Sequence, residues 1–129
     1  MIKTITATWI LESTRPDLVA NWFTGHAYQV SQFLVKAQQL AYGGVDEEDS
    51  ISKIVDELER LHQLAAYERF LVQHATDENA VLFETSEFRL CKVTIEESKK
   101  SIDADINEIT RLRAFVNKLG ACVDKFSRG

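Results

Sequence analysis

Apolar residues recur along most of this chain at the three- and four-residue spacing of amphipathic helices. Between Pro16 and Tyr42 this spacing predicts a helix with one buried face. Thr14 is a residue type that caps helix starts, and Pro16 suits the first helical position. Gly43 and Gly44 mark the end, because glycine is common directly after a helix. The residues expected on the buried face are Val19, Phe23, His26, Val30, Phe33, Ala37 and Leu40.

A second apolar pattern predicts another helix from about Glu47 to His74. The acidic residues 46–49 lie at its start, where negative charge interacts favourably with the helix dipole. The residues expected to be buried are Ile51, Ile54, Val55, Leu58, Leu61 and Ala65.

The most regular pattern lies in the last third of the chain, where we expect a helix from about Ile95 to Phe126. A β-branched apolar residue returns at every seventh position, in the series Ile95, Ile102, Ile109, Val116 and Val123. Leucine or phenylalanine fills the intervening core position toward the C-terminus, a combination that favours parallel two-stranded coiled coils. Such a helix spans about 48 Å at the usual rise, whereas a compact chain of this size is about 36 Å across.

The heptad pattern therefore predicts self-association as a homodimer. The expected contact consists of Ile109, Leu112, Val116, Leu119, Val123 and Phe126, flanked by Glu108 and Arg113, whose charges would meet across the dimer. The alternative is that this face packs antiparallel on the second helix of the same chain.

Other segments show patterns that differ from those of the helices. Residues 2–11 alternate between apolar side chains and threonines, which predicts a strand. The apolar runs 81–84 and 88–93 predict two short strands, because the capping-box pattern at 94–97 would start a helix directly after them. The expected fold is a single α+β domain of residues 1–129, with an N-terminal strand, two long helices, a weak two-strand segment and a long C-terminal heptad helix. An all-α helical bundle is the alternative.

Charge and cysteine content restrict the classes of partner and compartment. The acidic net charge of -5 repels the phosphate backbone, so nucleic acid is not an expected partner. No run of about 18 apolar residues is present to span a membrane, and the N-terminus lacks the pattern of a signal peptide. Cys91 and Cys122 lack CxxC spacing, as expected of reduced thiols in the cytoplasm. Residues 1–45 carry few charges, and we expect them to supply core or a contact surface.

One segment of the first helix combines aromatic, amide, hydroxyl and imidazole side chains. Such a mixture is typical both of ligand pockets and of protein interfaces. The candidate residues for binding a ligand or partner are Asn21, Trp22, Thr24, His26 and Tyr28. Alternatively, Phe23 and His26 are ordinary core residues. Trp22 and Tyr28 would then lie at the edge of the apolar strip with their polar atoms in water.

The sequence contains no GxGxxG, GxxxxGK[ST], GxSxG or HExxH motif. Glu59 and His62 have the ExxH spacing of di-iron bundles, but a second ExxH is missing. Asp103 begins a run that matches the first ligands of a calcium loop, yet Glu108 stands where glycine is required. We therefore expect no metal ion and no cofactor.

The expected function is that of a small non-catalytic interaction protein, a dimeric regulator, adaptor or inhibitor that acts through protein–protein contacts. The first alternative is a protein that binds or sequesters a small molecule or nucleotide in a pocket near Trp22, His26 and Tyr28. The second alternative is an enzyme with a dispersed site that includes Glu59 and His62.

Overall fold

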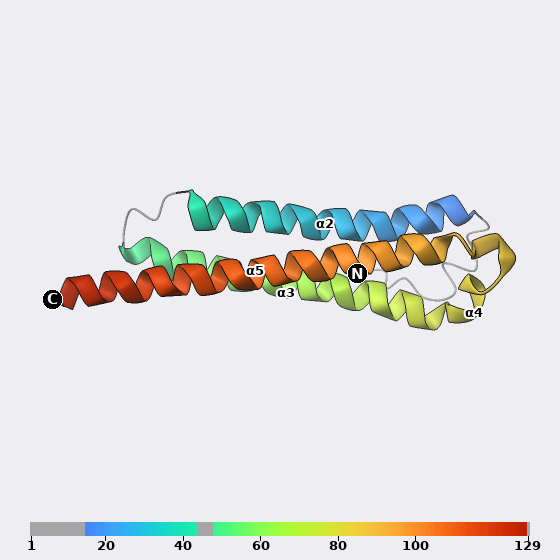
Figure 1. Ribbon diagram of the computed structural model, residues 1–129. Helices are drawn as coiled ribbons and strands as arrows, with labels where there is room; N and C mark the ends of the chain where they lie inside the picture. Colours follow the sequence, from blue (N-terminus) through green and yellow to red (C-terminus); the bar gives the residue numbers. More distant parts are fainter. Residues whose placement is uncertain (1–14, 44–47, 129) are drawn as a thin grey trace, which may run out of the picture.

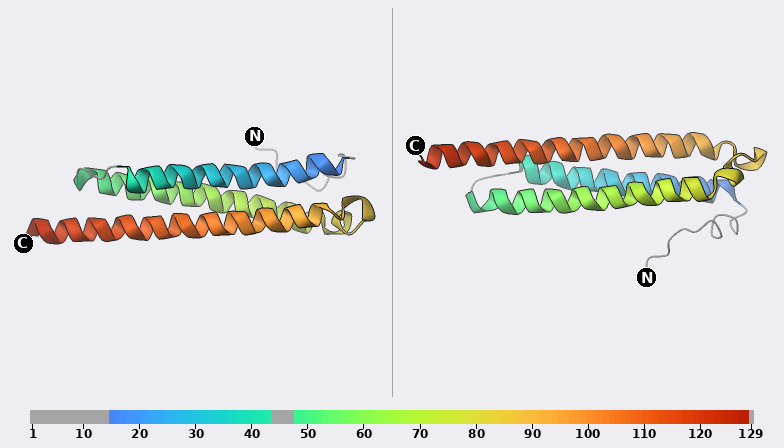
Figure 2. Two further views of the ribbon diagram at one scale, coloured as in Figure 1. Left: turned by 45° about the horizontal axis from the view of Figure 1, so that its top comes forward. Right: turned by 90° about the horizontal axis from the view of Figure 1, so that it is seen from below.

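The computed structural model of the chain is an elongated helical bundle (Figure 1). It describes the backbone of residues 15–43 and 48–128, and the side chains of residues 15–43 and 51–121. Helices α2 (Pro16–Tyr42) and α5 (Cys91–Arg128) run in the same direction, and α3 (Glu48–Glu78) runs antiparallel to both. The short helix α4 (Ala80–Phe83) and the 3-10 helix η1 (Ser86–Phe88) connect α3 to α5 at one end. At the other end, α5 extends past α2 and α3 (Figure 2).

The predicted α+β class is wrong, and the all-α helical bundle that was its alternative fits the structure. The segments 81–84 and 88–93, expected as strands, instead form α4, η1, the turns beside them and the first residues of α5. No strand occurs in residues 15–43 and 48–128, and the strand expected at 2–11 lies outside the described residues.

Local hydrogen bonding and burial explain why the expected strand pair is helical. The amide of Glu84 donates to the carbonyl of Val81 at 3.2 Å, and the amide of Phe88 donates to that of Thr85, also at 3.2 Å. These tight turns bury Phe83 and Phe88 at the end of the bundle. The backbone groups therefore find partners within the segment, and both aromatic rings join the core without a neighbouring strand.

The helix predicted over Pro16–Tyr42 is confirmed at both ends. Arg15, and not Thr14, occupies the position before the helix, where its carbonyl accepts the amide of Leu18 at 3.2 Å. Helix α3 continues about one turn beyond His74 to Glu78, and α5 starts about one turn before Ile95.

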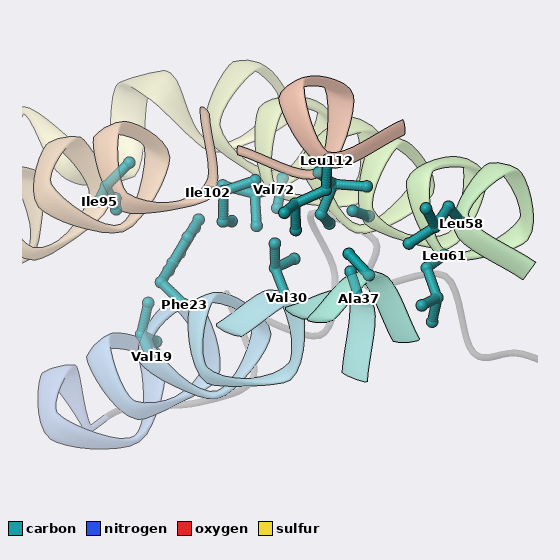
Figure 3. Close-up of a cluster of buried hydrophobic side chains, with 14 of the residues drawn as sticks. Val19, Phe23, Val30, Ala37, Leu58, Leu61, Val72, Ile95, Ile102 and Leu112 are labelled. Carbon is teal, nitrogen blue, oxygen red and sulfur yellow. The ribbon is translucent and has the colours of Figure 1, made fainter. Parts of the chain in front are cut away.

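The hydrophobic core runs along the axis shared by the three long helices (Figure 3). Burial of each valine, leucine, isoleucine or phenylalanine side chain contributes about 1.5–3 kcal/mol. The Cys91 thiol donates to the carbonyl of Pro16 at 3.5 Å and so joins the starts of α5 and α2. The completely buried apolar residues are Val19, Phe23, Val30 and Ala37 of α2, Leu58, Ala65 and Val72 of α3, and Ile102, Ile109, Leu112 and Val116 of α5.

No helix in the described part of the chain is both long enough and apolar enough to cross a lipid bilayer.

Candidate functional site

The candidate residues of the first helix lie on two different faces of α2. Because successive residues of a helix are rotated by about 100°, Trp22 and His26 share one face. Both are half-buried, on the side of α2 that faces the bundle. The side chains of Asn21, Thr24 and Tyr28 are exposed on the opposite side. The structure therefore does not bring the five residues together into one pocket.

The inward-facing residues form a polar contact between α2 and α3. The Nδ1 atom of His26 forms an ion pair with Oε2 of Glu68 on α3, and both side chains are largely buried. The Trp22 ring lies against the imidazole, with the ring centroids 4.1 Å apart. Trp22 also meets the Phe23 ring edge-on. Since a buried polar group needs a partner, His26 and Glu68 satisfy each other and fix α2 against α3.

Glu68 was missed in the sequence, although its position carried a signal. It lies three residues after Ala65 and four before Val72, which are both completely buried. A carboxylate at such a core position requires a partner within the bundle, because an unpaired buried charge is strongly unfavourable.

The outward-facing residues belong to a longer surface that runs along α2. We call it the outer strip, and it consists of the exposed residues Asn21, Thr24, Tyr28, Val35, Gln39 and Tyr42. Tyr28 is 66% exposed, Val35 41% and Tyr42 59%. Among the exposed residues from Leu18 to Tyr42, Lys36 alone is charged.

The outer strip continues onto α5 at one end. The Tyr42 ring contacts that of Phe115, with centroids 5.8 Å apart, and Arg111 Nη2 donates to the Tyr42 hydroxyl at 3.5 Å. Sequence reasoning found Asn21, Thr24 and Tyr28 but missed Val35, Gln39 and Tyr42. The available signal was a second heptad spacing, at positions 21, 28, 35 and 42, on the face opposite the buried one.

The residues predicted to self-associate have partners within the chain wherever their side chains are described. Ile109, Leu112 and Val116 are completely buried in the core, and Leu119 is half-buried. The side chains of Val123 and Phe126 lie outside the described residues. Self-association through the end of α5 stays a prediction.

The charged residues that flank this seam also have partners in the same chain. Glu108 forms an ion pair with Arg111 on the outside of α5, and their hydrogen bond lowers the pKa of the Glu108 carboxyl. Arg113 forms an ion pair with Glu59 on α3. Glu108 and Arg113 thus contribute to the surface and to α3–α5 packing within the chain.

The motifs considered for metal binding do not form a metal site in the described part of the chain. Glu59 of the ExxH pair is held by Arg113, and Asp103 of the calcium-like run pairs with Arg69 on α3 at 2.7 Å. Among the residues with described positions, no three histidine, cysteine or acidic side chains converge on a point where an ion would fit.

Cys91 was the described thiol to consider as a nucleophile. It is 2% exposed, and burial raises the pKa of its thiol. Because the thiolate is the reactive form, this thiol is both shielded and protonated. Its environment is that of a structural cysteine.

Two cavities in the described region lie away from the candidate residues. One of about 310 Å³ is lined by Phe83 and Ile95, among others, and a second of about 330 Å³ lies between α2 and α3 beside Lys36 and Arg60. Trp22, His26 and Tyr28 line neither of them.

The outer strip is consequently a long surface whose low charge the bundle itself does not explain. Comparison of the chain with protein-family models, with curated proteins and with solved structures finds no match.

Proposed function

We propose that this chain is a small non-catalytic interaction protein, a regulator, adaptor or inhibitor, and that it binds a protein partner through the outer strip of α2. The observation that carries this proposal is a long exposed helix face on which Lys36 is the one charged residue between Leu18 and Tyr42 and which presents Tyr28, Val35 and Tyr42. The centres of protein interfaces are poor in Lys, Glu and Asp and rich in tyrosine.

The bundle does not need an outer face on α2 that is almost free of charge. Exposed helix faces usually carry charged side chains, and that of α5 does so here, whereas the exposed residues of α3 between Arg60 and Asp77 are uncharged. Tyrosine supplies a large, rigid contact area together with a hydroxyl, so it suits a surface that is wet when free and covered when bound.

The proposal places the protein in the cytoplasm. Cys91 is a free, buried thiol, and free thiols persist in reducing compartments. The acidic net charge of -5 supports a protein partner over nucleic acid.

Site-specific photo-cross-linking tests this function. A photoreactive phenylalanine analogue replaces Val35 in the outer strip or, as a matched control, the exposed Asn107 on α5. In cells that make the protein, irradiation should give a discrete protein adduct from position 35 and little or none from position 107. If position 35 yields no more adduct than position 107, the outer strip is not an interaction surface and the proposal fails.

A further inference from the structure

The groove between α2 and α3 is charged in one half and apolar in the other. The charged half is the cavity that Lys36 and Arg60 line. Leu18 lies five helical turns before Lys36, and Trp22 lies two heptads before it, so both lie on nearly the same side of α2. Tyr67 lies one heptad after Arg60, on the same side of α3. We call this second part of the groove the apolar half, and it consists of Leu18, Trp22, Tyr67 and Leu71.

The ion pair of His26 with Glu68 brings these residues to the same level of the bundle. Because α2 and α3 are antiparallel, Trp22, four residues before His26, lies at the level of the residues about four after Glu68. Leu18 is 46% exposed and Tyr67 40%, and Trp22 is half-buried. The apolar half therefore presents large side chains that the three helices cover only in part.

The apolar half also has little charge around it. The exposed residues of α3 between Arg60 and Asp77 are uncharged, and so are those of α2 from Leu18 to Val35. The groove between α3 and α5 differs, because the ion pair of Arg69 with Asp103 bridges it at 2.7 Å. A contiguous exposed apolar surface usually marks a contact with another apolar segment.

The start of α2 connects the apolar half directly to residues 1–14. Helix α2 begins beside the end of α3, and Leu18 lies in its first turn (Figure 1). Residues 1–14 contain Trp9 and four large aliphatic residues, and Lys3 and Glu12 are the charged ones. We infer that residues 1–14 of the same chain dock in the apolar half, with the Trp9 ring against its side chains.

The length of the connection permits this contact. Tyr67 lies at the level of Ala27, which is about 18 Å along the helix from Arg15. Trp9 is six residues before Arg15, so an extended backbone carries it about 20 Å from that residue. Trp9 can therefore reach the whole apolar half. A covalently attached segment is also present at a high effective concentration, which favours it over a separate molecule as the occupant.

This inference goes beyond the proposed function and does not depend on it. Leu18 and Trp22 lie on the side of α2 next to α3, whereas Tyr28 and Val35 point away from the bundle. Docking of residues 1–14 leaves the outer strip open to a partner. Failure of the photo-cross-link at position 35 and failure of the contact proposed here are thus separate results.

Disulfide trapping on the full chain tests the contact. In a Cys122→Ser background that keeps the buried Cys91, Ala7→Cys or Thr8→Cys is combined with Tyr67→Cys. The matched control combines either one with Lys100→Cys, an exposed position on the outer side of α5 nine residues after the Cys91–Pro16 contact. During mild oxidation of dilute protein, at least one groove pair should form an intrachain disulfide about tenfold faster than its control pair.

Two results of this experiment overturn the inference. One is an equal rate of disulfide formation in the groove pairs and the control pairs. The other is a disulfide that joins two chains without an intrachain product, because the occupant of the groove would then belong to a second copy.

A double-mutant cycle measures the contact without added cysteines. Trp9→Ala and Tyr67→Ala should each lower the Tm of the full chain. Together they should lower it by less than the sum, because each substitution removes the partner of the other. The control combines Trp9→Ala with Tyr28→Ala in the outer strip, where the two shifts should add. Additive shifts in both combinations would place Trp9 away from the groove and overturn the inference.

Discussion

Helices α2 and α5 lie parallel in the same bundle and bury similar inner faces, but their outer faces differ in chemistry. The exposed side of α5 carries charged residues along its described length, namely Lys92, Glu96, Glu97, Lys100, Asp103, Arg111 and Lys118. The corresponding side of α2 carries only Lys36 between Leu18 and Tyr42. Packing within one chain accounts for both inner faces. Packing within one chain does not determine the composition of the outer faces. The difference in charge between them therefore reflects whether each face contacts solvent or a partner.

The largest expected effects test whether the inner faces of α2 and α5 contribute equally to the stability of the core. Phe23 of α2 and Leu112 of α5 are both completely buried. Truncation should lower the free energy of unfolding by about 3–5 kcal/mol for Phe23→Ala and by about 2–5 kcal/mol for Leu112→Ala. Urea denaturation at low protein concentration measures both. A loss below about 1 kcal/mol in one variant only would show that its helix contributes little to the core.

The next effect concerns the ion pair of His26 and Glu68, a polar contact within the apolar packing of α2 on α3. Glu68→Ala leaves His26 without its partner in a largely buried position, which should lower the free energy of unfolding by about 1–3 kcal/mol. Glu68→Gln keeps an acceptor oxygen and should lower it less. Glu57→Ala, at an exposed ion pair with Arg60 on the same helix, is the control and should change little. If Glu57→Ala and Glu68→Ala lower the free energy of unfolding equally, the buried pair contributes no more to stability than the exposed one.

Two glycines provide a smaller and opposite pair of effects. Gly25→Ala should raise the free energy of unfolding of the monomer by about 0.5–1 kcal/mol, because alanine favours the helix and the site is open. Gly43→Ala should lower it, because a Cβ atom there would overlap the carbonyl oxygen of Gln39. Thermal unfolding at a concentration that keeps the chains monomeric measures both. A loss on Gly25→Ala would mean that α2 itself needs this glycine.

The smallest effect concerns Asp105, a carboxyl group on the otherwise mostly apolar inner face of α5. Burial raises the pKa of the Asp105 carboxyl, so the folded chain keeps this proton to higher pH than the unfolded chain. The contribution of this group to stability is therefore lost as pH rises from the ordinary aspartate pKa through the raised one. Asp105→Asn should stabilise the protein slightly at pH 7, with no advantage in strong acid. An advantage that persists unchanged at low pH would contradict this origin.

The parts of the fold that could be predicted from the sequence depend on local signals. Pro16 and Gly43 delimit α2 because their backbone preferences act without any distant contact. The buried faces follow from helical periodicity. The segment 81–93 could not be predicted, because a short apolar run suits a strand or a helix equally, and burial of Phe83 and Phe88 at the end of the bundle decides between them.

In the candidate site, too, the features set by neighbouring residues could be predicted, whereas the contacts between distant residues could not. That α2 carries an unusual cluster was visible, but the partner of His26 is Glu68, which is 42 residues away. The heptads of α5 predicted a buried face without saying whose helix covers it. Burial of Ile109 against its own chain or against a second copy needs the same sequence pattern.

The parallel pairing of α2 with α5 has a consequence for the order in which the protein is made. The contact between Pro16 and Cys91 joins residues 75 positions apart. At about 5–20 residues per second, the ribosome completes the second partner roughly 4–15 s after the first. Throughout that interval, α3 alone can cover the inner face of α2, and the part that α5 covers stays exposed. Nascent chains that end before Cys91 should therefore be cleaved by protease within α2 faster than the full chain.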